Sequence, residues 1–109
     1  LTVNGNYTQG PTGVLNVELG GTTQGVNYDL LQVNGTASFD GTLNVSMFGG
    51  FTGAAGNVFD VITYTSRTGD FATINFPSGF GMTATPNATF YQLALATVPV
   101  AAGGSGSAV

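Results

Sequence analysis

The stretch that decides the fold is a near-duplication: residues 1–21 read LTVNGNYTQGPTGVLNVELGG, and residues 31–50 read LQVNGTASFDGTLNVSMFGG. Both copies open on Leu-x-Val-Asn-Gly, then carry Leu-Asn-Val, and close on Gly-Gly. Matching residues are offset by 30 positions at the start, 28 in the middle and 29 at the end. A period of this size, written in short β-type segments separated by turn residues, indicates stacked β-strand rungs rather than a catalytic domain.

Each copy alternates apolar and polar residues, which predicts strands with one buried and one solvated face. Strands are expected at residues 1–3, 14–19, 31–33, 42–47, 58–64, 71–76 and 89–98, with a turn at 66–70. No segment has helical periodicity over three turns. The inward-facing positions are expected to form a shared core made of Leu1, Val3, Leu15, Val17, Leu31, Val33, Leu43, Val45 and Val61.

The fold class is therefore expected to be all-β, a short β-solenoid of the right-handed β-helix kind with an atypical C-terminal cap. A two-sheet β-sandwich is the alternative, because alternation alone does not separate the two. One domain is expected over residues 1–98, with 1–30 and 31–57 as duplicated rungs and 58–98 as the cap region. Residues 99–109 have the composition of a linker or of a donor-strand tail.

The composition excludes several classes of function. Only 6% of the 109 residues are charged, the net charge is −4, and a single Lys or Arg is present. One cation cannot neutralise a nucleic-acid backbone, so no nucleic-acid partner is expected. No run of 18 apolar residues predicts a membrane-spanning helix. A chain this polar and poor in charge is typical of exported bacterial proteins, which predicts an extracellular or cell-surface location.

Catalytic and cofactor chemistry is not expected, since the chain contains no His, Cys or Lys. The carboxylates are spaced singly, and a serine or threonine nucleophile would lack a base. Calcium is the one metal worth weighing, at the turns that hold Asp40 and Asp70, but solvated turns are the favoured interpretation. No catalytic residue, cofactor or metal site is therefore predicted.

Most of the aromatic residues are expected to be core and cap residues. A sugar-stacking or contact patch around Phe76, Phe80 and Tyr91 is the minority interpretation. An assembly interface is expected at the last strand and the tail, where an apolar segment could pair with an open sheet edge of a neighbouring copy. Its residues would be Leu93, Leu95, Val98 and Val100.

The pattern resembles the region near the C-terminal end of autotransporter passenger β-helices. It is also similar to repeats of secreted proteins with a C-terminal sorting signal of the Val-Pro-Glu-Pro kind. The matching elements lie within residues 1–75, from the Leu-x-Val-x-Gly opening to Gly69-x-Phe71. The resemblance implies a right-handed β-helix on an exported bacterial protein, without catalytic residues to transfer.

The expected function is that of a non-enzymatic extracellular structural protein, a self-assembling filament or surface-fibre subunit built from β-strand rungs. Its partners would be copies of itself, and possible further partners are a polysaccharide or a host surface. The alternative is an adhesin or carbohydrate-binding segment of a larger secreted or autotransporter protein.

Overall fold

The computed structural model describes residues 1–24 and 26–97. This part of the chain is all-β and forms eleven strands and no helix, so it contains no helix that could cross a membrane. The strands are β1 Thr2–Val3, β2 Tyr7–Thr8, β3 Val14–Leu19, β4 Leu31–Val33, β5 Thr36–Phe39, β6 Thr42–Met47, β7 Val58–Thr63, β8 Ser66–Gly69, β9 Thr73–Asn75, β10 Gly81–Pro86 and β11 Phe90–Thr97.

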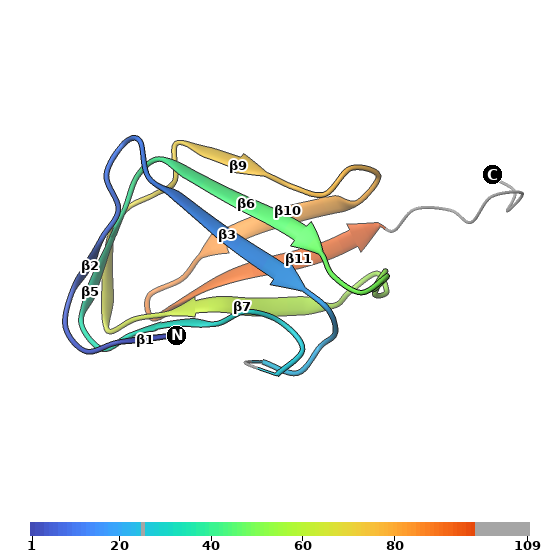
Figure 1. Ribbon diagram of the computed structural model, residues 1–109, viewed down its shortest axis with the longest axis horizontal. Helices are drawn as coiled ribbons and strands as arrows, with labels where there is room; N and C mark the ends of the chain where they lie inside the picture. Colours follow the sequence, from blue (N-terminus) through green and yellow to red (C-terminus); the bar gives the residue numbers. More distant parts are fainter. Residues whose placement is uncertain (25, 98–109) are drawn as a thin grey trace, which may run out of the picture.

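The first nine strands visit three sheets in strict rotation (Figure 1). Strands β1, β4 and β7 lie side by side in one sheet, β2, β5 and β8 in a second, and β3, β6 and β9 in a third. All pairs among these nine strands are parallel. We call β1–β3, β4–β6 and β7–β9 the first, second and third triplets. Three sheets around one interior differ from the two facing sheets of a sandwich.

The strand register reproduces the offsets of the sequence repeat. Tyr7 lies opposite Ala37, which is an offset of 30, and Leu15 lies opposite Leu43, which is an offset of 28. Matching residues of the two copies therefore sit directly on one another. The third triplet continues this order beyond residue 57, although its sequence no longer resembles the first two.

Polar side chains on the outer faces form ladders across the triplets. Asn75 donates its Nδ2 to Oδ1 of Asn44 at 2.8 Å, and Asn44 donates in the same sense to Asn16 at 3.2 Å. On the second sheet, the hydroxyls of Thr36 and Ser66 lie 2.8 Å apart. Side chains in register satisfy one another without charge, which explains how so few charged residues suffice.

The corners are held by side chains that replace backbone partners. The buried Gln9 donates its Nε2 to the carbonyl oxygens of Asp40 at 2.7 Å and Thr42 at 3.2 Å, and its Oε1 accepts the Tyr7 hydroxyl at 2.9 Å. Below it, Gly41 adopts φ +70, which confirms the turn predicted at this position.

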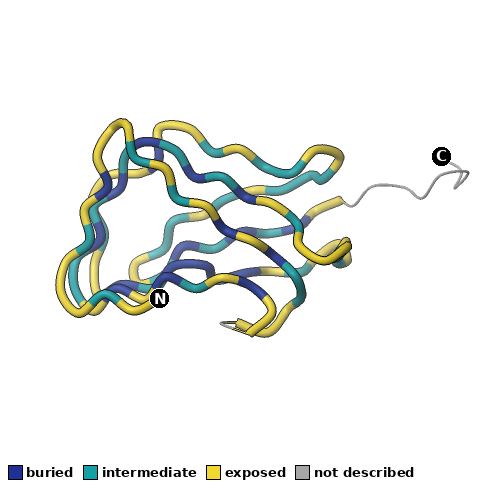
Figure 2. The backbone as a smooth tube through the Cα atoms, in the orientation of Figure 1, coloured by how far each residue is buried: buried dark blue, intermediate teal, exposed yellow. Residues whose placement is uncertain are grey.

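The core runs along the interior of the three sheets, as the dark segments of Figure 2 show. Six of the nine predicted core residues are buried, while Val3 and Leu15 are half-buried. The six are Val17, Leu31, Val33, Leu43, Val45 and Val61.

The prediction for Leu1 is wrong, because its side chain is 88% exposed. Its carbonyl oxygen accepts a hydrogen bond from Gln32, so the backbone is in place. Val3 and Leu15 belong to the first triplet, which has a neighbouring triplet on one side only, and Leu1 directly precedes it. Val17 and Leu19 of the same triplet are nevertheless buried, because the segment that contains Tyr28 lies beside that half of β3. Exposure is therefore greatest where no chain segment lies beside the first triplet.

A hairpin completes the C-terminal end. Strand β11 pairs antiparallel with β7 on one side and with β10 on the other. In Figure 1 the hairpin lies between β7 and β9, behind the open triangle formed by the three sheets. Its inward residues Tyr91, Leu93 and Leu95 are buried at 0%, 0% and 1% exposure. The hairpin therefore covers the interior below the third triplet.

Two expectations for the cap region are wrong. The predicted turn at residues 66–70 is strand β8, because its backbone is the third parallel partner in register with β5. Strand β10 was not expected, because its Gly and Pro residues and weak alternation give little strand signal. Residues 58–97 thus contain a third triplet followed by a hairpin.

We predict that Val45→Asp abolishes cooperative unfolding at neutral pH, since Val45 lies in the central triplet at 5% exposure and a buried unpaired charge costs several kcal/mol. The neighbouring Ser46 is exposed, and Ser46→Asp should change the free energy of unfolding by about 0.5 kcal/mol or less. Urea unfolding followed by circular dichroism measures both. Equal stability of the two variants would contradict the placement of the core.

A second pair of variants tests the stacked corner. An added Cβ at Gly41 would fall on the carbonyl oxygen of Gly13, and the residue also has positive φ. Gly49 has a similar φ of +65 but open space around it. Gly49→Ala should lower the free energy of unfolding by about 1–2 kcal/mol, because alanine disfavours the left-handed conformation. Gly41→Ala should lower it clearly more, because the backbone clash adds to the same conformational cost. The free energies of unfolding of the two variants decide it, and a smaller cost at Gly41 would disprove the close approach.

Candidate functional site

The two acidic turns considered for calcium hold their own backbones. Asp40 accepts the N–H of Gly41 on Oδ1 at 2.8 Å, and Asp70 accepts the N–H of Phe71 at 2.7 Å. Within residues 1–24 and 26–97, no three His, Cys, Asp or Glu side chains come together as metal ligands. The described geometry thus gives both carboxylates a role in forming corners.

Asp70 also anchors the hairpin. The Tyr91 hydroxyl donates to Oδ1 of Asp70 at 2.5 Å, and the Tyr91 side chain is fully buried. Burial raises the pKa of Tyr91 most, and the hydrogen bond to Asp70 and its negative charge raise it further. A phenol held protonated in this way is suited to a structural hydrogen bond. Sequence spacing could not find this pair, because its members lie 21 residues apart, Asp70 in the corner after β8 and Tyr91 in β11.

Tyr91 belongs to an aromatic cluster in the interior. Phe39 stacks on Phe71 with ring centroids 4.6 Å apart, and Tyr91 meets Phe39 edge to face at 5.8 Å. The core position expected for most aromatic residues is confirmed for Tyr91, which has no exposed surface, and the minority interpretation of a contact patch is wrong for it. Phe76 and Phe80 are half-buried and pack against the same core. These rings are used for packing at the hairpin end rather than for a surface.

The single cation is engaged at the same end. Arg67 lies in β8, opposite Ala37, and its Nη1 donates to the carbonyl oxygen of Gly69. Burial raises the pKa of Tyr64, and the nearby Arg67 partly offsets that rise. The one cationic side chain of the chain is thus located in the third triplet.

The predicted assembly interface is wrong for the two leucines. Leu93 and Leu95 are buried, and β11 is paired on both edges by β7 and β10. A strand with both edges occupied inside its own chain has no edge to donate. Val98 and Val100 lie outside the described residues.

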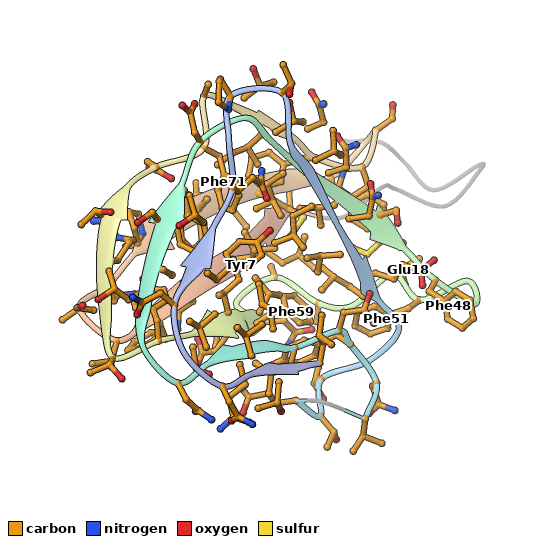
Figure 3. All side chains as sticks on the ribbon, turned by 60° about the vertical axis from the view of Figure 1, so that its left-hand side comes forward. Tyr7, Glu18, Phe48, Phe51, Phe59 and Phe71 are labelled. Atoms are coloured by element: carbon orange, nitrogen blue, oxygen red, sulfur yellow. The ribbon has the colours of Figure 1, made fainter. Side chains whose placement is uncertain are left out.

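A groove of about 550 Å³ lies at the first triplet. We call it the end groove. Figure 3 shows Glu18 and Phe48 at its outer corner, whereas Tyr7, Phe59 and Phe71 point into the interior. Three of the five exposed large apolar side chains line this groove. They are Leu1, Val26 and Phe48, and the inner wall is formed by Leu15, Val17, Tyr28 and Leu31.

One wall of the end groove is formed by residues 26–31, which run beside β3. The N–H of Glu18 donates to Oδ2 of Asp29 at 2.9 Å, and the Glu18 carbonyl accepts the N–H of Asp29 at 3.1 Å. Tyr28 turns inward and meets Phe59 edge to face at 5.3 Å. This segment therefore closes the outer edge of β3 at its C-terminal half.

The charged side chains that line the end groove, Glu18 and Asp29, are both negative, while Arg67 lies in a different sheet. The amino group of Leu1 also lines the groove and donates to the carbonyl oxygen of Leu30 at 3.0 Å. Sequence reasoning missed this feature, since residues 22–30 have no counterpart in the repeat and their fold-back depends on one carboxylate. The only available signal was the pair of isolated apolar residues Val26 and Phe48 beside glycine-rich turns.

Comparison with known proteins identifies no relative: no protein-family model matches the chain, and no curated protein sequence is similar to it.

The buried Tyr91–Asp70 pair predicts an alkaline loss of stability. An unfolded tyrosine titrates near pH 10, whereas the folded pKa of Tyr91 is higher. Its contribution is full below about pH 10 and declines as the pH rises toward the folded value, with a slope of about 1.4 kcal/mol per pH unit. Tyr91→Phe should remove this part of the slope and cost about 1–3 kcal/mol at pH 7, because Asp70 loses a partner.

Urea unfolding between pH 7 and 11 measures both effects. Tyr7→Phe is the matched control, because the Tyr7 hydroxyl bonds the neutral Gln9 and only burial raises the Tyr7 pKa. Its alkaline slope should change less than that of Tyr91→Phe. An unchanged slope in Tyr91→Phe would show that this phenol does not govern stability at high pH.

Proposed function

We propose that the chain is a short β-solenoid in which each triplet is one coil and the hairpin β10–β11 is the cap. The support is the register: strands of successive triplets lie parallel, and matching positions recur after 28 to 31 residues. The polar ladders on the outer faces recur with the same spacing. Stacked repeats of this kind build elongated scaffolds.

The proposed function is a non-enzymatic structural role in an extracellular protein of the bacterial surface. Four of the five carboxylates support it, because each already binds a backbone or side-chain partner. Asp40 and Asp70 hold corners, Asp29 closes a strand edge, and Asp60 accepts Gln92 at 2.9 Å. The export of the chain rests on its composition and on the resemblance to passenger β-helices.

The difference between the two ends favours a segment of a larger surface protein over a filament subunit. A filament needs two open ends that fit each other. Here the hairpin covers the interior at one end, and its outer strand β10 ends at Pro86, a residue that discourages further pairing. This asymmetry is the observation that carries the choice. At the other end, the exposed apolar side chains of Leu1 and Val14 are the observation that favours assembly into a filament.

We predict that the purified chain forms no fibres. Sedimentation velocity should give a monomer, and negative-stain electron microscopy should show no filaments. A variant that ends at Thr97 is the matched control for the tail and should behave identically. If the full chain forms fibres and the shortened variant does not, the chain is a filament subunit with the tail as its connector, and the proposal of a segment of a larger surface protein is wrong.

A further inference from the structure

The end groove lies beside a strand edge whose backbone is only partly used. The N–H of Thr42 donates to the Gly13 carbonyl at 3.0 Å, and the N–H of Phe48 donates to the Leu19 carbonyl at 2.8 Å. Every second residue from Gly13 to Leu19 therefore directs its backbone groups toward β6. In a parallel ladder the residues between them direct their backbone groups to the other side. These are Val14, Asn16 and Glu18.

Of these three residues, Glu18 has both backbone groups bonded to Asp29. Val14 and Asn16 lie where β3 forms the edge of the described sheet. Their N–H and C=O groups suffice for a short added strand. The fold already uses a pairing of this length, because β9 pairs with β6 only through Thr42, Leu43 and Asn44. A strand added here would leave the segment around Asp29 in place.

The side chains beside this edge specify what such a strand should carry. Inward of β3 lie Leu15 and Val17 together with the exposed Leu1 and Val26 of the groove, so inward residues should be apolar. Outward on β3 stands Glu18, with Asp29 next to it, so the outward residue of the added strand that lies nearest to them should be basic. Because side chains alternate along a strand, one extended segment can meet both demands.

We propose that the end groove binds an extended peptide of alternating apolar and basic residues, which adds as a strand to β3 beside Val14 and Asn16. Backbone hydrogen bonds supply the pairing, and the apolar side chains fill the groove. The acidic rim selects a cationic partner and repels a second copy of this chain, which would bring its own Glu18 and Asp29. The inference goes beyond the proposed structural role.

The test uses the full chain and a short capped peptide of alternating lysine and valine, labelled for fluorescence anisotropy. The lysine–valine peptide should bind, more weakly as salt is raised, and a glutamate–valine peptide should not. Glu18→Gln should weaken binding roughly two- to fivefold, as expected for one exposed ion pair. The matched control Asp40→Asn removes the same charge at a corner outside the groove and should leave binding unchanged. Equal binding of both peptides, or no binding of either, would overturn the proposal.

Backbone methylation separates strand addition from simple charge attraction. Methylating the valine nitrogens blocks one edge of the peptide strand, and methylating the lysine nitrogens blocks the other. An added strand loses binding with one modification and keeps it with the other. If both modified peptides bind as the parent does, the contact is electrostatic and the proposal is wrong. A dimer of the chain that the lysine–valine peptide dissociates would assign the groove to a second copy and would also overturn it.

Discussion

The structure depends on the parallel backbone ladder that joins each triplet to the next. None of the strands β1 to β9 is longer than six residues, and such strands are unstable alone. Pairing at a fixed offset places identical residues on one another, as with Leu15 and Leu43 or Asn16 and Asn44. That single constraint produces the apolar interior column and the outer amide ladder together. It also explains why the chain can fold with very few charges.

The ladder explains which parts of the fold were predictable from sequence. Strands β3, β4 and β6 were predicted at their observed bounds, because alternation is strict there and the repeat aligns two of them. The whole second sheet was missed. Its strands are short and rich in Ser, Thr and Gly, so they gain their conformation from pairing rather than from local preference. The register confirmed the offsets of 30 and 28 that the sequence gives for the two copies.

The candidate site was less predictable for a physical reason. One of its walls comes from the connection after β3, and repeats specify strands rather than connections. The closure of that connection over β3 depends on Asp29, whose carboxylate could equally have belonged to a solvated turn. Conversely, Leu93 and Leu95 were predicted to serve in assembly, because the sequence of an apolar strand does not show which strands pair with it. Only the antiparallel pairing with β7 and β10 decides that they are interior.

The hairpin also determines the order in which we expect the parts of the chain to fold. Its two strands are joined by a tight connection in which the N–H of Asn87 donates to the carbonyl of Phe90 at 2.8 Å. By contrast, each triplet meets the next only after about thirty residues of chain have been closed into a loop. Local contacts form before distant ones because less chain entropy is lost. We therefore expect folding to start at the hairpin, which offers β7 an edge, and to propagate one triplet at a time toward the N-terminus.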